Sequence, residues 1–188
     1  FDLDEEGRVR SDTANEVITD RPKIVAVTHV GNTTGAITDI APIIRRAHEV
    51  GAVFVLDACQ SVPHLKVDFH ALDVDFAAWS AHKMYGPTGV GFLYGKREML
   101  EALPPANFGG SMVELAWMDQ EAQYMEPPAR FEAGTQPVAQ VVAAGVAAEW
   151  LMNIGMENLE AHERTITDEL LKMGDIDGIR ILGPRSNK

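Results

Sequence analysis

The sequence predicts an α/β fold built on a mostly parallel sheet, and three observations support this. Short, β-branched, apolar runs alternate with helical patterns, as in a βαβ unit. The first run is almost continuously apolar, which suits a strand buried on both faces. Polar side chains follow the runs directly, as they do at the carboxyl edge of an open α/β sheet, where ligands bind.

The first strand and helix of this unit are predicted from residue 23 onward. Residues 23–29 are β-branched and apolar and form the first strand. An amphipathic helix follows from about Ile40, because its apolar residues recur at i, i+3, i+4 and i+7. Thr38 or Asp39 can cap its start, and Gly51 ends it.

Three further strands follow the helix. Residues 53–56 form the second strand, which ends at Asp57, and residues 75–79 form the third, which ends at Ser80. The fourth strand, 90–94, follows a glycine-rich turn. This turn lacks the Gly-Lys-Ser/Thr ending of a phosphate loop and leads into a strand, so it is interpreted as a tight turn.

The second half of the chain contains a long irregular segment and two helices. Residues 104–137 have no clear periodicity, and a connection this long in a compact domain is usually functional or packed on a partner. Helices are predicted over 138–154, which breaks at Gly155, and over about 156–173.

Composition excludes several classes of protein. A net charge of −12 and a pI near 4.8 argue against nucleic-acid binding, and no apolar run approaches the ~20 residues of a membrane span. Without a leader-like start, a cytoplasmic location is expected. Cys59 is the only cysteine and the histidines lack ligand spacing, so neither a disulfide nor a metal site is predicted.

Residues able to bind or react gather where three consecutive strands end. They are Asn32, Asp57, Gln60, Ser80, His82 and Lys83. Since the carboxyl ends of parallel strands share one edge of the sheet, these side chains are expected to converge. Taken singly, an aspartate there is more often a cap and a lysine more often solvated, while Asn32 beside Gly31 equally suits a turn.

Four segments resemble one known family in their order along the chain. Ser-Ala-His-Lys-Met-Tyr-Gly-Pro-Thr-Gly-Val-Gly at 80–91 resembles the lysine signature of class V aminotransferases, which bind pyridoxal phosphate (PLP). The likeness is strongest to group II cysteine desulfurases and selenocysteine lyases. Residues 56–61, 29–32 and 130–135 resemble further segments of the family, and the similarity covers about residues 23–182.

The resemblance implies a fold and a division into domains. The fold is the three-layer α/β/α arrangement of the large domain of PLP-dependent transferases of fold type I, followed by the start of a C-terminal small domain. Residues 1–22 are expected to be a polar segment that is truncated or partly disordered. Residues 23–154 belong to the large domain, and 155–188 comprise a linking helix and the start of a truncated small domain.

The resemblance also implies how each residue would contact the cofactor. Lys83 would hold PLP in a Schiff base and shuttle a proton, since the pKa of a lysine falls readily on desolvation. Asp57 would keep the ring nitrogen protonated, because a buried carboxylate favours the charged form. Gln60 would bond the phenolic oxygen, and Ser80 and His82 would hold the phosphate.

Two more residues are implied to act at the same site. Thr135 typically reaches the phosphate of the neighbouring subunit in this family, so a homodimer is expected. Asn32 would touch the cofactor or the substrate carboxylate. Cys59, flanked by Ala58 and Gln60, is interpreted as a small core residue, because the family's persulfide cysteine lies on a loop beyond this chain.

The expected function is that of a PLP-dependent cysteine desulfurase. The substrate would be L-cysteine or L-selenocysteine, and sulfur would pass to an enzyme cysteine outside this chain. An acceptor protein would then use it for iron–sulfur cluster or thio-cofactor assembly. Other class V reactions, such as those of an aminotransferase, epimerase or kynureninase, remain open, as does a silent domain that only dimerises.

Overall fold

The computed structural model describes residues 1–186, so the last two residues of the predicted 155–188 segment lie outside it. Its strands are β1 (Ile24–Thr28), β2 (Val53–Asp57), β3 (Phe76–Ser80), β4 (Gly91–Gly95), β5 (Val113–Leu115) and β6 (Gln123–Tyr124). Its α-helices are α1 (Ala14–Val17), α2 (Ala41–Glu49), α3 (Arg97–Ala102), α4 (Val138–Ile154) and α5 (Met156–Leu171). Short 3-10 turns are η1 (Ser11–Thr13), η2 (Ala81–Lys83), η3 (Ala129–Phe131) and η4 (Lys172–Asp175).

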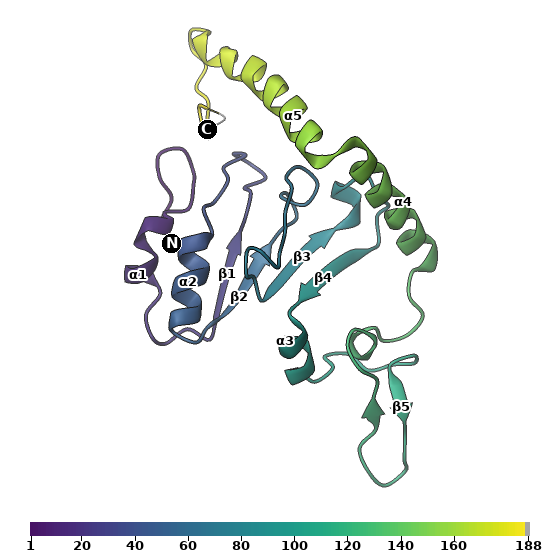
Figure 1. Cartoon of the computed structure of the whole chain (residues 1–188). Helices are drawn as coiled ribbons and strands as arrows, with labels where there is room; N and C mark the ends of the chain where they lie inside the picture. The colour runs from purple at the N-terminus through teal and green to yellow at the C-terminus, as the bar shows by residue number, and fades with distance from the viewer. Residues whose placement is uncertain (187–188) are drawn as a thin grey trace.

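The main sheet has the order β1-β2-β3-β4 (Figure 1). The first three strands are parallel, with Thr28 opposite Asp57 and Asp57 opposite Ala78. The fourth strand runs antiparallel to β3, so that Ser80 faces Gly91 and Phe76 faces Gly95. The carboxyl ends of β1, β2 and β3 therefore share one edge, and the chain returns along β4 to the opposite edge.

One face of the sheet carries the hydrophobic core. Ile43, Ile44 and Ala47 of α2 are buried in one cluster with Phe54 and Leu56 of β2. Together with the buried Ile40 they follow the i, i+3, i+4 and i+7 spacing that places them on one side of the helix, as the sequence predicts. Complete burial of side chains of this size stabilises the fold by about 1.5–3 kcal/mol each.

The other face of the sheet is open within residues 1–186. Ile24 is 63% exposed and Leu93 is 62% exposed, and Ala26 and Ala78 on the same face are also exposed. The apolar sequence of β1 predicts burial on both faces, but the described chain covers only one. The residues of β1 suit a strand that is covered on both faces. Helix α2 covers one of these faces and does not cover the other.

A buried charge cluster ties the amino edge of the sheet together. The Asp75 carboxylate is 2% exposed and accepts hydrogen bonds from the Phe54 backbone N–H at 2.7 Å and Lys96 Nζ at 2.8 Å. His48 Nε2, near the end of α2, lies 3.0 Å from the same carboxylate. The cluster thereby links α2, β2, β3 and the residue after β4.

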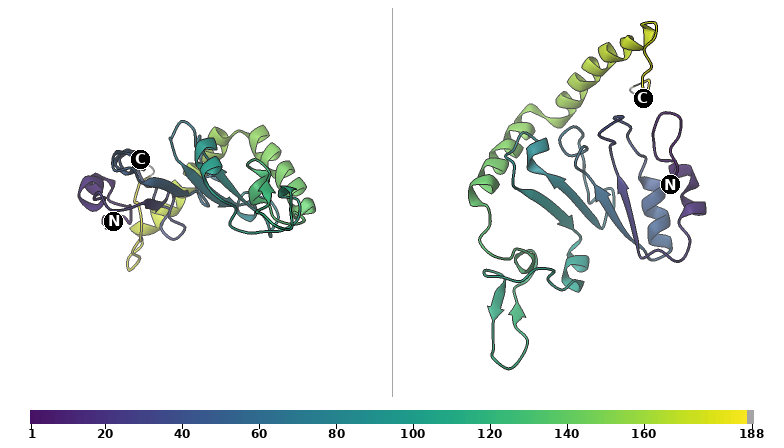
Figure 2. Two further views of the ribbon diagram at one scale, coloured as in Figure 1. Left: turned by 90° about the horizontal axis from the view of Figure 1, so that it is seen from below. Right: turned by 180° about the vertical axis from the view of Figure 1, so that it is seen from behind.

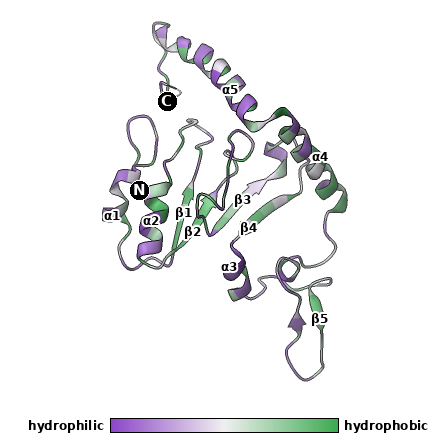
Figure 3. Ribbon diagram, in the orientation of Figure 1, coloured by the Kyte–Doolittle hydropathy of each residue, from purple (hydrophilic) through white to green (hydrophobic). Residues whose placement is uncertain are grey.

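Helices α4 and α5 run past the edge of the sheet and meet at a bend (Figures 1 and 2). Gly155 occupies the bend with φ +86°, a conformation that favours glycine, and the angle is 77°. Helix α4 is apolar all round, whereas α5 is largely hydrophilic (Figure 3). No single helix in residues 1–186 is long and apolar enough to cross a membrane, and this bent pair passes that test only when both helices are combined.

The polar segment 1–22 and the irregular segment 104–137 both contain regular structure. Within residues 1–22, Ala14 and Ile18 are buried in the core cluster beside α2. The 104–137 segment follows α3 and carries the small β5–β6 sheet. It lies beyond the end of β4, away from the carboxyl edge of β3 (Figure 1).

Candidate functional site

The carboxyl ends of β1 and β2 place Asp57 on the open face of the sheet. Its Oδ1 accepts the Cys59 backbone N–H at 3.0 Å, and its Oδ2 accepts the Thr28 hydroxyl at 3.3 Å. A carboxylate offers about four lone-pair positions, so these two bonds orient Asp57 and leave room for another donor. Because Asp57 is exposed, that donor can approach from outside the sheet.

Lys83 ends the short turn η2 that follows β3. The Met84 and Gly86 backbone N–H groups both donate to the Ala81 carbonyl at 2.9 Å, which closes the chain tightly around the lysine. A Cβ at Gly86 would lie 2.9 Å from that same carbonyl oxygen, so only glycine fits there. The glycine-rich stretch is therefore the tight turn that the sequence predicts, and it fixes Lys83 directly beyond the sheet.

The pKa of the Cys59 thiol depends on burial and on nearby polar groups. Burial raises its pKa, the Asp57 carboxylate raises it further, and the Lys83 ammonium and Ser80 hydroxyl act in the opposite direction. Asp57, Ser80 and Lys83 come from the carboxyl ends of the adjacent strands β2 and β3, and the Cys59 Sγ lies 3.9 Å from the Ala78 carbonyl oxygen of β3. Cys59 is only half-buried, so it is not the fully buried core residue that the sequence suggests.

We expect the Cys59 thiol to react slowly with iodoacetamide at neutral pH, because its raised pKa keeps it protonated. The pH of half-maximal alkylation should lie above that of the same chain unfolded in urea. Asp57→Asn should shift this pH downward and Lys83→Ala should shift it upward, as followed by mass spectrometry. A native thiol that titrates like the unfolded one would contradict this arrangement.

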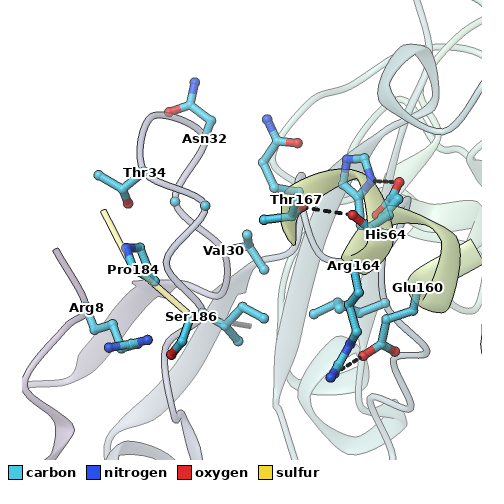
Figure 4. Close-up of a pocket in the computed structure, with 16 residues that line it drawn as sticks. Arg8, Val30, Asn32, Thr34, His64, Glu160, Arg164, Thr167, Pro184 and Ser186 are labelled. Carbon is cyan, nitrogen blue, oxygen red and sulfur yellow. Dashed lines mark hydrogen bonds and ion pairs between the residues drawn. The ribbon is translucent and has the colours of Figure 1, made fainter. Parts of the chain in front are cut away.

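A cavity of about 410 Å³ adjoins this edge (Figure 4). Asn32 lies on its wall in the loop after β1, and Gln60 lies on its wall in the turn after β2. Asp57 and Lys83 are not among its lining residues. The structure thus brings the sequence-predicted residues into two neighbouring groups, one around Cys59 and one along this cavity.

The far wall of the cavity is helix α5, which sequence reasoning did not connect to the site. Glu163 Oε1 lies 2.8 Å from His64 Nδ1, which belongs to the loop after β2. Arg164 pairs with Glu160 at 2.6 Å on the same stretch of helix (Figure 4). No local pattern indicates the contact between His64 and Glu163, because 99 residues separate them.

The remaining predicted residues lie apart from these two groups. His82 precedes Lys83 in η2 and is exposed. Thr135 is exposed in the segment between η3 and α4, where the Gly134 N–H donates to the Gly110 carbonyl at 2.8 Å. That segment lies beyond the opposite edge of β3, so the structure does not bring Thr135 to Lys83 within one chain (Figure 1).

Known proteins resemble this chain over almost its whole length. Residues 1–188 match the family described as Aminotransferase class-V. A relative from Mycobacterium leprae, named "Probable cysteine desulfurase 2", is 46% identical over 99% of this chain and 44% of its own length. The chain therefore spans less than half the length of this relative.

Solved structures give the same result for the fold. A cysteine desulfurase from Thermococcus onnurineus, solved in its apo form, superposes with a TM-score of 0.91 at 33% identity, over 98% of this chain and 46% of that one. A structure described as SspA in complex with cysteine gives a TM-score of 0.64 at 28% identity, over 78% of this chain and 38% of that one. The predicted α/β fold with a mostly parallel sheet is confirmed.

Proposed function

The chain belongs to the class-V aminotransferase family, and from this we propose that it is the cofactor-binding part of a PLP-dependent cysteine desulfurase. The observation that carries the proposal is that Asp57 ends β2 and Lys83 follows the adjacent parallel strand β3, so both come from the carboxyl edge of the sheet. The cysteine desulfurases of similar sequence and the cysteine-bound relative support the substrate.

The residues at this edge fit PLP, which enzymes of this family use, in their chemistry. PLP requires a primary amine, a carboxylate facing its ring nitrogen and donors for its phosphate. Lys83 supplies the amine, Asp57 the carboxylate, and Ser80 and His82 the donors. When bound, PLP supplies an electron sink for the electron pair released as the Cα–H bond of an amino acid breaks.

Lys83 and Asp57 carry the two central roles in this proposal. Lys83 Nζ holds the cofactor and then accepts the Cα proton of the substrate. Asp57 Oδ keeps the ring nitrogen protonated, and its bonds from Cys59 N–H and the Thr28 hydroxyl fix its direction. The tight turn that Gly86 permits fixes the backbone on either side of Lys83.

The other predicted residues would bind and orient the cofactor and the substrate. Gln60 would donate to the phenolic oxygen of the cofactor, while Ser80 and His82 would hold its phosphate. Asn32, on the wall of the cavity that faces α5, would bind the carboxylate of the substrate. The exposed Thr135 would reach the phosphate of a second subunit, which makes a homodimer part of the proposal.

The proposed reaction converts L-cysteine to L-alanine, and an enzyme cysteine outside this chain accepts the sulfur. The Cβ–S bond of the substrate breaks, the sulfur forms an S–S bond with the acceptor thiol, and Cβ takes up a proton. The raised pKa of Cys59 disfavours it as that acceptor, since the thiolate is the nucleophile. L-Selenocysteine would react in the same way. A partner protein in the cytoplasm would carry the sulfur to iron–sulfur cluster or thio-cofactor assembly.

The proposal is tested with the full-length protein that contains this chain. Incubation with L-cysteine, PLP and a thiol reductant should yield alanine and sulfide in equal amounts. Alanine without sulfide, or amino-group transfer to a 2-oxo acid, would instead indicate another class V reaction. Borohydride reduction followed by peptide mapping should place the cofactor on Lys83, and a label elsewhere would mean that the cofactor lysine lies outside this chain.

A further inference from the structure

Helix α5 is held over the cavity by side chains at its surface. It leaves α4 at the Gly155 bend, and none of its residues is buried. Two ion pairs join it to the loop after β2. One links His64 Nδ1 to Glu163 Oε1 at 2.8 Å, and the other links Lys66 Nζ to Glu157 Oε1 at 2.6 Å.

The two ion pairs differ in their exposure to water. The side chains of Lys66 and Glu157 are 70% and 67% exposed, whereas those of His64 and Glu163 are 40% and 32% exposed. A pair in full contact with water contributes little, because solvent and salt screen the charges and two long side chains must be ordered. The pair between His64 and Glu163 is therefore the less exposed to screening by solvent and salt.

The same pair joins two walls of the cavity. His64 and Gln60 belong to one loop, and both line the cavity. Glu163 lines it from α5, and its carbonyl accepts the Thr167 hydroxyl at 2.9 Å (Figure 4). A change in this single contact would alter the distance between α5 and the loop that carries Gln60.

We propose that His64 is a positioning residue that holds α5, through Glu163, as the wall of the pocket for an α-amino-acid substrate. The inference rests on the proposed function, because that function assigns Asn32, on the wall of this cavity, to the carboxylate of the substrate.

The kinetic test uses the full-length protein and four variants. His64→Ala and Glu163→Ala should each raise KM for cysteine by about fivefold and leave kcat within about twofold. The double variant should be no worse than either single one, because both remove the same contact. Glu163→Gln, which keeps an acceptor for the imidazole N–H, should restore most of the loss.

Lys66→Ala is the matched control, since it removes the exposed pair from the same loop and should leave KM unchanged. Equal effects of Lys66→Ala and His64→Ala, or additive effects in the double variant, would overturn the inference. So would an unchanged KM in His64→Ala.

Hydrogen–deuterium exchange gives a readout that does not depend on activity. Peptides covering α5 and residues 60–66 should exchange faster in His64→Ala than in Lys66→Ala, at an unchanged melting temperature. If the full-length protein makes no alanine from cysteine, the proposed function fails while this comparison still decides how α5 is held. Equal exchange in the two variants would show that His64 does not position the helix.

Discussion

Replacing Lys83 with alanine is expected to abolish incorporation of PLP and to lower alanine formation by about 10²- to 10⁴-fold, the range for loss of a general acid–base group. Lys83 is the one lysine in the turn η2 that follows β3, so no other amine of this turn can substitute for it. The measurement compares the visible absorption and the rate of alanine formation in the variant and in the unaltered full-length protein.

Lys66→Ala serves as the control for this experiment, because Lys66 is exposed and pairs with Glu157 away from Lys83. It should keep both the absorption and the rate. Full activity in Lys83→Ala would remove the basis for assigning the cofactor to this edge of the sheet.

Replacing Asp75 with alanine is expected to lower the free energy of unfolding by about 3–5 kcal/mol, the usual result of removing one partner of a buried ion pair. The change would leave the Phe54 N–H without its acceptor in the interior and leave Lys96 with only its bonds to the exposed Asp73. Urea unfolding followed by tryptophan fluorescence measures it. A loss below about 1 kcal/mol, the range of an exposed pair, would contradict the structure.

The pH dependence of stability gives a second test of Asp75. Burial alone would raise the pKa of this carboxyl, but bonds from Lys96, the Phe54 N–H and His48 outweigh burial and lower it. The folded pKa therefore lies below the unfolded value of about 3.9. The stabilisation is present above about pH 4 and is lost as the pH falls through the folded pKa. Asp75→Asn should remove this part of the acid sensitivity.

The strands and long helices were predictable from sequence because their signals are local. Predicted strand ends differ from the structure by one residue, as with 53–56 against Val53–Asp57, and 138–154 matches α4. Local pattern could not give the antiparallel direction of β4, which depends on how the turn at Gly86 folds back. It also could not tell which sheet face is covered, because that depends on other parts of the chain.

The candidate site was predictable only where residues follow strand ends. Asp57, Ser80 and Lys83 come to the same edge because the parallel register aligns the ends of β2 and β3, and this follows from topology. The role of Cys59 was misjudged, since an apolar neighbourhood in sequence does not reveal which face a strand end presents. The partnership of His64 with Glu163 joins residues 99 positions apart and requires the three-dimensional path of α5.

The bend at Gly155 makes α5 a lever arm. With 16 residues, the helix is about 24 Å long at 1.5 Å per residue. A rotation of about 10° at Gly155 would carry its far end about 4 Å and displace Glu163, less than halfway along, by about 2 Å. A displacement of that size breaks a hydrogen bond of ordinary length. A small torsion at one glycine would thus be amplified into opening or closing a whole side of the cavity, and the contact between Glu163 and His64 that resists it lies near the middle of the helix.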